Sequence, residues 1–459
     1  MPGLHALNAS FRRTRLTGWG HTSPSVGSLV PVDVEQDAAS IVSSNPVRGV
    51  IARGLGRSYG DAAQNGGGST LDMTTFDRVL DFDPASGIVE VEAGVSLNTL
   101  IQRFLPLGWF IPVSPGTRAV TVGGAIAADV HGKNHHRVGS FGEHIRSLDL
   151  LTGDGRLLHL TPEATPAEFW ATVGGMGLTG AVMRATIALT AVPSSFVSVG
   201  TRRAEDLDAL MALQVEMDAE HPYSVAWIDC LSKGARLGRG VLTVGRFAEL
   251  DELLPSQALD PHTIPGEPLI EAPRYLPNGL LNRWTVAAFN EMWFRKAPRS
   301  RDAEIQSMSR FFHPLDGIGG WNRMYGSNGF LQYQFVVPDA RADVVRLAIE
   351  ELSSIGAASF LAVLKRFGPH NPAPLSFPIA GWTLALDIPA GVDGLAPTLD
   401  RLDEAVAAAG GRIYLAKDSR MRPELLAAMY PLLTEWQDVR SALDPNGTFQ
   451  SDLARRLTL

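Results

Sequence analysis

Three glycine-rich loops, each next to an apolar strand, constrain the fold of this chain more than any other sequence feature. The first, residues 53–61 (RGLGRSYGD), follows the apolar strand Val50–Ala52. The second is residues 115–129 (PGTRAVTVGGAIAAD), and the third, residues 173–180 (VGGMGLTG), precedes the apolar strand Ala181–Leu189. Glycine tolerates positive φ, so the N–H groups of such loops can point at one anion. Three of them predict a large ligand, and a planar cofactor with a diphosphate would account for all three.

The first loop differs from the dinucleotide-binding fingerprint of parallel α/β folds. Gly54, Gly56 and Gly60 are spaced G-x-G-x-x-x-G, one residue longer than that fingerprint, and no amphipathic helix follows directly. Arg53 or Arg57 could stand beside a diphosphate. Taken alone, the loop is equally compatible with an ordinary surface turn, so its meaning depends on the other two loops.

Length and charge limit the remaining possibilities. A chain of 459 residues predicts two or three folding units. The net charge of −8 argues against a nucleic-acid partner, and a single cysteine, Cys230, excludes an intramolecular disulfide and is best interpreted as a buried apolar residue. We expect no secretory signal, because Arg12, Arg13 and Arg15 are not followed by an apolar run, and we expect no transmembrane helix.

Hydrophobic periodicity predicts two regions with different patterns of secondary structure. In the first, Val89 and Val91 alternate with Glu90 and Glu92 as in a half-exposed strand, and Ser96 caps an amphipathic helix. In the second, strands alternate with helices in the order strand, helix, strand, strand, helix, which is typical of an antiparallel α+β unit. These five segments are residues 331–337, 344–352, 360–365, 381–387 and 395–406, and the proline-rich residues 369–378 are expected to form an ordered loop.

The order of the three loops resembles the FAD-binding domain of the vanillyl-alcohol-oxidase-type (PCMH-type) flavoproteins. The resemblance covers residues 32–189 and returns in the last ~50 residues. It implies a two-domain α+β fold, with an FAD-binding domain at residues 1–192 and 411–459 and an inserted antiparallel-sheet substrate domain at residues 193–410.

The same resemblance implies the residues that bind FAD. Covalent members of the group commonly carry a flavin-linking histidine in the first loop, whereas this chain has Tyr59, so we expect non-covalent FAD. The implied FAD-binding residues are Arg53, Gly54, Leu55, Gly56, Arg57, Ser58, Tyr59, Gly60, Gly116, Thr121, Gly123, Gly124, His131, Asn134, Ala181 and Tyr414.

Within that group the chain is most similar to the decaprenylphosphoryl-β-D-ribose 2-oxidases. The motifs that carry this similarity are HGKNHH (131–136), PNG (277–279), FHPLD (312–316), GFLQYQF (329–335), AKDSR (416–420) and DLARR (452–456). Their reaction oxidises the 2-hydroxyl of a polyprenylphosphoryl ribose, the first half of an epimerisation to arabinose for cell-wall arabinan. A separate NADH-dependent short-chain reductase completes it. We expect a cytoplasmic protein, with peripheral contact at the inner membrane where such a substrate lies.

The similarity also implies the active-site residues. Lys417, His131 and Lys133 are the expected catalytic or substrate-orienting groups, and a lysine can act as a base only if burial or nearby cations lower its pKa. The expected substrate-binding residues are Trp227, Phe312, Gln332, Gln334, Lys365, Thr383 and Ala385. Alternatively, Lys417 belongs to a surface ion pair, and the two glutamines lie on a solvent-exposed sheet face. We expect no metal at His131, His135 and His136, because no carboxylate or cysteine completes a typical spacing.

Three positions depart from the family pattern. Ala385 replaces a cysteine that nitroaromatic inhibitors attack, Phe312 replaces a tyrosine, and Val225 replaces a serine. Each change removes a polar group from the expected pocket. Two alternatives therefore stay open, an oxidase of another sugar or alditol on the same fold and a catalytically inactive flavin-binding partner subunit.

Overall fold

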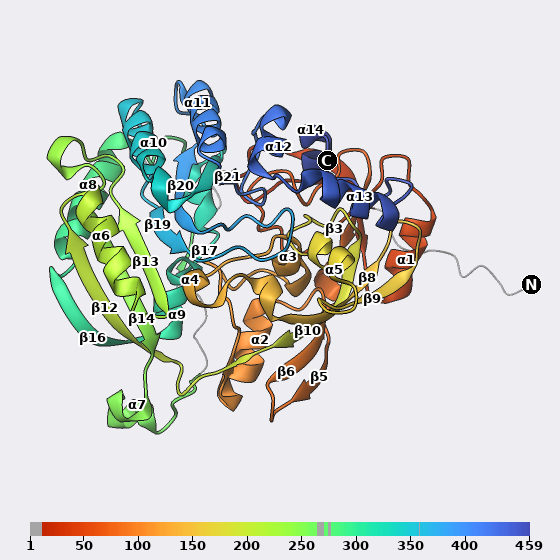
Figure 1. Ribbon diagram of the computed structural model, residues 1–459, viewed down its shortest axis with the longest axis horizontal. Coiled ribbons are helices and arrows are strands. Elements are labelled where there is room, and N and C mark those ends of the chain that lie inside the picture. Colours follow the sequence, from red (N-terminus) through yellow and green to blue (C-terminus); the bar gives the residue numbers. More distant parts are fainter. Residues whose placement is uncertain (1–11, 264–269, 274–276, 358) are drawn as a thin grey trace, which may run out of the picture.

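The computed structural model describes residues 12–263, 270–273, 277–357 and 359–459 as two α+β halves (Figure 1). One half, at the right of Figure 1, combines the first ~190 residues with the C-terminal helices; the other carries a large sheet built from the middle of the chain. This is the α+β class that the sequence predicts.

The right-hand half contains two sheets. In the four-stranded sheet, of order β1-β2-β4-β3, β2 and β3 run parallel to β4, whereas the five-stranded sheet, of order β5-β6-β10-β8-β9, is antiparallel throughout. Their strands are β1 Arg12–Leu16, β2 Ser25–Pro31, β3 Val50–Arg53, β4 Ser69–Asp72, β5 Val79–Asp83, β6 Ile88–Glu92, β8 Ile145–Leu151, β9 Leu157–Leu160 and β10 Ala181–Ala188. The helices of this part are α1 Glu35–Ser43, α2 Leu97–Phe104, α3 Val122–Ala127, α4 His135–Val138 and α5 Pro166–Thr172.

The left-hand half is built on an eight-stranded antiparallel sheet. Its order is β16-β12-β14-β13-β19-β20-β18-β21, and helix α6 packs on β12, β13 and β14. Its strands are β12 Phe196–Ala204, β13 Tyr223–Ile228, β14 Gly240–Phe247, β16 Ser300–Ser307, β18 Phe330–Val337, β19 Ala362–Phe367, β20 Gly381–Pro389 and β21 Arg412–Ile413. Its helices are α6 Leu207–Asp218, α7 Pro255–Ala258, α8 Arg283–Lys296, α9 Met308–Phe312, α10 Asp343–Ser354 and α11 Leu395–Ala408. Two short pairs, β7 Trp109–Phe110 with β11 Thr190–Ala191 and β15 Ile270–Glu271 with β17 Ile318–Gly319, complete the strands.

The local patterns of the sequence are mostly confirmed. The Ser96 hydroxyl accepts a hydrogen bond from the Thr99 amide at 3.0 Å and caps α2, and β18, α10, β19, β20 and α11 follow in the predicted order. One expectation is wrong. Glu92 of β6 does not face solvent: it is 1% exposed and accepts hydrogen bonds from Arg78. The charged partner, rather than the alternation, determines its burial.

The C-terminal segment crosses from one half to the other. It starts as β21, which pairs with β18 in the large sheet, and continues through α12 Leu426–Met429, α13 Leu433–Leu443 and α14 Asp452–Leu457. α13 packs against α5, and a bridge joins Phe449 to Val50 beside the four-stranded sheet. The residues between β21 and α12 therefore lie where the two halves meet, and Lys417 is among them.

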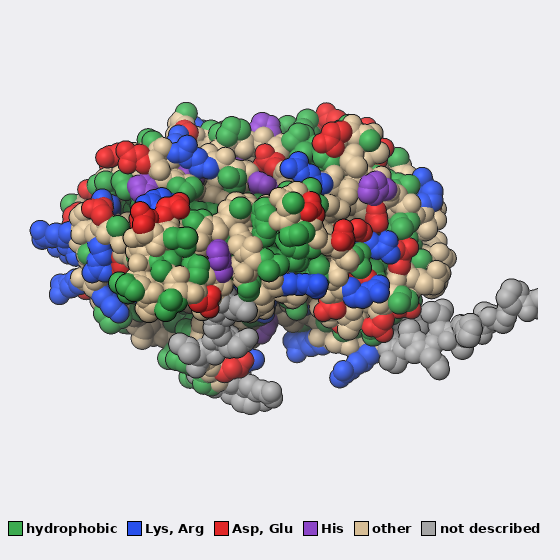
Figure 2. Space-filling model, turned by 90° about the horizontal axis from the view of Figure 1, so that it is seen from below, with side chains coloured by type: hydrophobic (Ala, Val, Ile, Leu, Met, Phe, Trp, Pro, Cys, Tyr) green, Lys and Arg blue, Asp and Glu red, His purple; other side chains and the backbone are tan. Residues whose placement is uncertain are grey.

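The surface and the helices agree with a mixed-charge globular protein. Basic and acidic side chains are interspersed over the face shown in Figure 2, consistent with the net charge of −8. Among the described residues, no helix is long and apolar enough to cross a membrane.

Candidate active site

The first glycine loop is held closely between the second loop and the C-terminal segment. A Cβ atom on Gly54 would lie 2.2 Å from Oγ1 of Thr121, and one on Gly60 would lie 2.0 Å from the carbonyl oxygen of Asp418. Gly56 has a φ of +64°, a conformation that L side chains rarely adopt. These three glycines are required because the backbone turns sharply and touches two other segments.

The second loop ends as the first turn of α3. Thr121 caps this helix by accepting a hydrogen bond from the Gly124 amide at 3.2 Å, and a Cβ atom on Gly123 would lie 3.0 Å from the Ala93 side chain. At Gly116, by contrast, a Cβ atom would meet nothing within 4 Å. The start of the loop therefore borders open space, while its end is fixed against the five-stranded sheet.

Both arginines of the first loop have partners within the protein. The Arg53 guanidinium donates to two backbone carbonyls at 2.8 Å, and burial lowers its pKa. Arg57 donates from Nε to the carbonyl of Ala119 at 3.1 Å and stacks 3.9 Å from the centre of the Trp19 ring. Arg57 thus joins the first loop to the second, while Arg53 holds the first loop to neighbouring segments, and a contact of either arginine with a diphosphate stays a prediction.

The other predicted FAD-binding residues fall into two groups. Tyr414 lies at the site: its hydroxyl donates to the carbonyl of Ala128 at 2.8 Å, and its ring centre lies 5.5 Å from that of His131. Ser58, whose carbonyl accepts from the Trp19 amide, belongs to the first loop. Leu55 is 41% exposed and Ala181 is fully buried in β10, and a contact of either residue with FAD stays a prediction.

Two buried polar atoms fit a bound heterocycle. Asn134 donates to the carbonyl of Pro112 at 2.9 Å, but its Oδ1 atom has no hydrogen-bond partner among the described residues. His313 shares a 2.7 Å hydrogen bond with Ser114, and its Nδ1 atom is likewise unpartnered in that part of the chain. Buried polar atoms are normally paired. These atoms lie beside the second loop, where a ring with N–H and C=O groups, such as a flavin, would satisfy them.

His131 is the centre of a buried polar cluster. Its Nε2 atom lies 3.0 Å from the amide nitrogen of Gln334, and its Nδ1 atom lies 3.2 Å from Nζ of Lys365. Gln334 also contacts the Thr383 hydroxyl at 3.3 Å. Burial, followed by the charge of Lys365, lowers the pKa of His131 well below its usual value, so the imidazole is neutral near pH 7.

Three lysines surround this cluster. Burial lowers the pKa of Lys133 and of Lys365 to about 7, with a further lowering from Lys365 and Lys417 respectively. Burial also lowers the pKa of Lys417 to about 8, and its ammonium group stands 3.9 Å from the centre of the Tyr59 ring. Lys133 donates to the backbone carbonyl of Phe311. All three side chains stay partly exposed, so their ammonium groups are not sealed in the core.

Asp387 is a site residue that the sequence analysis missed. It accepts a 2.5 Å hydrogen bond from the Gln332 amide, and burial raises its pKa to about 7. The negative charge of Asp387 raises the pKa of Lys417, and the positive charge of Lys417 in turn lowers the pKa of Asp387. A signal was available: Thr383 and Ala385 were expected from the similarity to the family, and the alternation of β20 places Asp387 on the same face.

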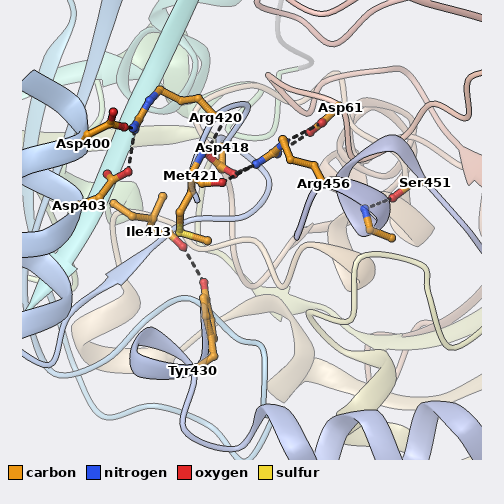
Figure 3. Close-up of polar contacts among 11 residues, drawn as sticks. Asp61, Asp400, Asp403, Ile413, Asp418, Arg420, Met421, Tyr430, Ser451 and Arg456 are labelled. Carbon is orange, nitrogen blue, oxygen red and sulfur yellow. Dashed lines mark hydrogen bonds and ion pairs between the residues drawn. The ribbon is translucent and has the colours of Figure 1, made fainter. Parts of the chain in front are cut away.

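The segment that carries Lys417 is fixed by its neighbour Asp418 (Figure 3). The Oδ1 atom of Asp418 accepts hydrogen bonds from the amides of Arg420 and Met421, at 3.0 and 2.8 Å, and its Oδ2 atom accepts from Arg456 at 2.8 Å. Arg456 also binds Asp61, the last residue of the first glycine loop, at 2.7 and 2.9 Å. One guanidinium of α14 therefore ties the lysine-bearing turn to the first loop.

The remaining predicted substrate residues lie on or near the same sheet face. Trp227, Lys365 and Ala385 share it, because cross-strand partners in an antiparallel sheet point the same way and Val363 pairs with both Trp227 and Ala385. Trp227 donates from Nε1 to the carbonyl of Phe360 at 3.0 Å. Phe312 is different: it is 2% exposed and packs in an aromatic cluster with Phe110, Tyr223, Phe247 and Phe311.

The three histidines of the HGKNHH motif do not converge. His135 accepts a hydrogen bond from the Gly368 amide at 3.2 Å, and His136 contacts the carbonyl of His221 at 3.0 Å, whereas His131 points to Gln334 and Lys365. In the described parts of the chain, no three His, Cys, Asp or Glu side chains are grouped so that they could hold a metal ion.

Comparison with known proteins agrees with these features. Residues 30–161 match the model of the FAD binding domain, and residues 398–457 match that of D-arabinono-1,4-lactone oxidase. A decaprenylphosphoryl-beta-D-ribose oxidase of Mycolicibacterium smegmatis is 46% identical over 97% of both chains. An uncharacterized protein of Streptomyces coelicolor is 44% identical over 80% of this chain and its own full length, and a D-lactate dehydrogenase of Anaerostipes hadrus is 26% identical over 42% of both.

The glycine loops, the unpartnered atoms beside them and the matched domain define an FAD-dependent oxidoreductase with the two-domain α+β fold of the PCMH-type flavoproteins. Within that class, the chain belongs to the decaprenylphosphoryl-beta-D-ribose oxidase family, because the similarity extends over nearly its whole length.

The arrangement allows oxidation of an alcohol next to an anionic group. When bound, FAD supplies a hydride acceptor. The chain itself offers Lys417, whose lowered pKa leaves an appreciable neutral fraction near pH 8 that can take a hydroxyl proton. Lys133 and Lys365 offer positive charge to an anion, and Gln332 and Gln334 offer amides to sugar hydroxyls.

Proposed function

We propose that the chain oxidises the 2-hydroxyl of a polyprenylphosphoryl-β-D-ribose to the 2-keto sugar, the first half of an epimerisation that supplies arabinose for cell-wall arabinan. The observation that carries this proposal is the meeting of Lys133, Lys365 and Lys417 around neutral His131. Three half-buried cations are costly unless an anion binds among them, and a phosphoryl sugar supplies that anion beside its hydroxyls. The name of the Mycolicibacterium smegmatis relative supports the same substrate.

Lys417 is the base in this proposal. Oxidation removes a proton from the 2-hydroxyl and a hydride from its carbon, and the proton passes to the neutral amine of Lys417. Asp387 then faces a newly formed ammonium group, which its charge stabilises. His131 orients the sugar while Gln334 and Lys365 hold its ring.

The remaining residues serve the cofactor and the sugar. FAD is bound non-covalently by residues 1–192 and 411–459, with the first and second glycine loops at its diphosphate and ring, and residues 193–410 bind the substrate. Trp227, Thr383 and Ala385 line the sugar pocket. Phe312 packs behind Lys133, whose ammonium group lies 6.0 Å from the centre of its ring.

A separate NADH-dependent short-chain reductase completes the epimerisation by returning hydride to the opposite face of the keto sugar. The protein acts in the cytoplasm with peripheral contact to the inner membrane, because its substrate carries a polyprenyl chain.

Anaerobic flavin bleaching tests the proposal. The FAD-loaded protein is mixed with polyprenylphosphoryl ribose, with the matched polyprenylphosphoryl arabinose, and with free ribose and alditols. Rapid bleaching by the ribosyl lipid alone is expected. Bleaching by a free sugar or alditol instead would assign another substrate, in line with the loss of polar groups at Ala385 and Phe312. Absence of bleaching by every compound would favour an inactive flavin-binding subunit.

A further inference from the structure

Helix α8 presents apolar side chains to solvent where a surface helix normally presents polar ones. Trp284 is 74% exposed, Met292 56% and Trp293 43%, and Leu280, just before the helix, is 44% exposed. These four side chains are named the α8 face, and helix α8 lies in the half of the molecule at the left of Figure 1. Met292 is near the middle of this face, with Trp284 and Trp293, about two and a half turns apart, on its two flanks. Exposed aromatic groups of this size mark contact with another apolar phase or surface.

Helix α8 is capped at its start and held by buried contacts. The exposure of its apolar side chains is therefore not caused by fraying of the helix. Asn282 caps its start by accepting from the amides of Trp284 and Thr285, at 2.9 and 3.2 Å. On its inner side, buried Asn290 donates to Asp229 at 2.7 Å. Arg239 joins Asp229 to Glu291 of the same helix, at 2.8 and 2.6 Å. The inner side of α8 buries Val286, Asn290 and Phe294 and is held by both packing and ion pairs. The outer side exposes Trp284 and Met292 beside the charged side chains of Arg295 and Lys296.

The surroundings of the α8 face are basic although the whole protein is acidic. Residues 280–301 contain Arg283, Arg295, Lys296, Arg299 and Arg301 against one acid, Glu291, in a chain of net charge −8. All five cations are exposed, and two of them pair with acids, Arg295 with Glu291 at 2.5 Å and Arg301 with Glu304 at 2.8 Å. Tryptophan and methionine flanked by arginine and lysine on one helix are the composition that binds at the boundary of an anionic bilayer.

An unbroken row of aromatic rings runs from the α8 face to the candidate active site. Starting at Trp293, neighbouring ring centres lie 5.9, 6.0, 6.0, 4.1 and 5.4 Å apart. The row consists of Trp293, Phe289, Phe360, Tyr325, Phe330 and Tyr59. Its last member is the ring over which the Lys417 ammonium group stands. The α8 face is thus continuous with the site through apolar packing.

From these observations we propose that the α8 face docks the protein on an anionic lipid bilayer, with Trp284, Met292 and Trp293 inserted at the interface. A protein partner or a second copy fits less well. A helix of 14 residues is about 21 Å long, so its outer strip covers far less than the roughly 800 Å² per partner of a stable protein interface. A bilayer needs only the inserted side chains and the surrounding charge. The inference assigns the peripheral membrane contact of the proposed function to one surface.

Vesicle co-sedimentation of the FAD-loaded full chain tests the proposal without any sugar substrate, so its failure and that of the proposed reaction are distinguishable. Binding is expected to phosphatidylcholine vesicles that contain about 30% phosphatidylglycerol, and to weaken at about 1 M salt, where screening acts within ~3 Å. The double variant Trp284→Ser/Trp293→Ser should lower binding by about tenfold or more, and Arg295→Gln/Lys296→Gln should also lower it. Neither variant alters a residue placed in the redox site.

Matched controls come from the opposite end of the molecule. Val47, fully exposed near α1, and the exposed pair Arg12 and Arg13 of β1 provide Val47→Ser and Arg12→Gln/Arg13→Gln, which should bind as the parent does. Three results would overturn the proposal: no sedimentation of the parent with anionic vesicles, equal binding by the tryptophan variant, or loss of a dimer in that variant without any vesicle binding. The last result would assign the α8 face to a second copy of the chain.

Discussion

The Nζ atom of Lys365 lies 3.2 Å from Nδ1 of His131, and Nε2 of the same ring lies 3.0 Å from the side-chain nitrogen of Gln334. A neutral imidazole has one N–H donor and one acceptor. The His131 ring therefore cannot accept a hydrogen bond from the Lys365 ammonium group at one nitrogen and another from the Gln334 amide at the other nitrogen. Either Lys365 is itself neutral and accepts from Nδ1–H, or the Gln334 amide is turned so that its oxygen accepts from Nε2–H. The hydrogen bonds of His131 therefore depend on whether Lys365 carries its proton.

Replacing Lys365 tests the cost of its burial. Its pKa is lowered to about 7, so between about pH 7 and 10.5 the unfolded chain binds more protons at this residue than the folded protein does. The contribution of Lys365 to the free energy of unfolding therefore rises with pH between about 7 and 10.5. Below about pH 7 the buried side chain is charged and opposes folding. In the apoprotein at pH 7, Lys365→Met should raise Tm by on the order of 2 °C, and in the FAD-loaded protein the same change should lower the rate of substrate oxidation.

Differential scanning fluorimetry at several pH values measures this effect. Lys233→Met, at an exposed position, is the control and should leave Tm nearly unchanged. A fall of several degrees in Lys365→Met would mean instead that the contact with His131 stabilises the fold.

Lys417 should control the chemical step. Lys417→Ala is expected to keep FAD, because the glycine loops remain, and to slow flavin bleaching by ~100-fold or more. Lys417→Arg should recover little of that loss, because a guanidinium does not deprotonate near neutral pH. In the parent, the bleaching rate should rise with pH through about 8, as the amine becomes neutral. Single-turnover kinetics with excess substrate measure this rate, and near-parental bleaching by the alanine variant would leave Lys417 a structural role only.

The sequence predicts local features well and long-range contacts poorly. Periodicity and capping predict α2 and the order of β18, α10, β19, β20 and α11, because each pattern is read within one segment. Arg456 bridges Asp418 and Asp61, and the residues of this bridge are up to 395 positions apart in the sequence. No local pattern encodes such a contact. The burial of Phe312 among aromatic rings, like that of Glu92 beside Arg78, likewise follows from which segments meet. Asp387 is different: the sequence analysis missed it, although the alternation of β20 continued from Thr383 and Ala385 would have placed it on the substrate face.

FAD should leave the protein without breaking a covalent bond. The first loop carries Tyr59, whose ring packs edge-on against Phe330 with centres 5.4 Å apart and whose burial raises its pKa well above its usual value, so it is no nucleophile at neutral pH. Acid precipitation of the yellow protein should therefore release the flavin into the supernatant, as absorbance at 450 nm shows. Flavin that remains in the parent pellet would contradict the prediction.

Ala385 should make the protein insensitive to covalent nitroaromatic inhibitors. A nitroso product formed in the pocket needs a thiol, and Cys230 is 1% exposed with a pKa that burial raises, so its reactive thiolate is scarce. After turnover with such an inhibitor the intact mass of the parent should be unchanged. Ala385→Cys restores a thiol on the half-buried position facing Gln334 and should gain one adduct that peptide mapping places at residue 385. An adduct on the parent, or none on the variant, would show that β20 does not face the inhibitor.

Asp387 should set the pH at which Lys417 becomes a base. Its carboxylate raises the pKa of Lys417, and the two buried groups titrate as a pair. In Asp387→Asn the amide can still contact Gln332, but the negative charge is gone, so burial alone acts on the lysine and its pKa falls. The inflection in bleaching rate should therefore move below about pH 8, and the variant should lose less activity at low pH than at high pH, because more of its Lys417 is neutral at low pH. The same pH series on Asp403→Asn, which removes a carboxylate bound to Arg420 rather than one facing Lys417, is the control and should keep the parental inflection. An unchanged inflection in Asp387→Asn would mean that another group is the base, and Lys365 or Lys133, both with a pKa of about 7, would be the next to test.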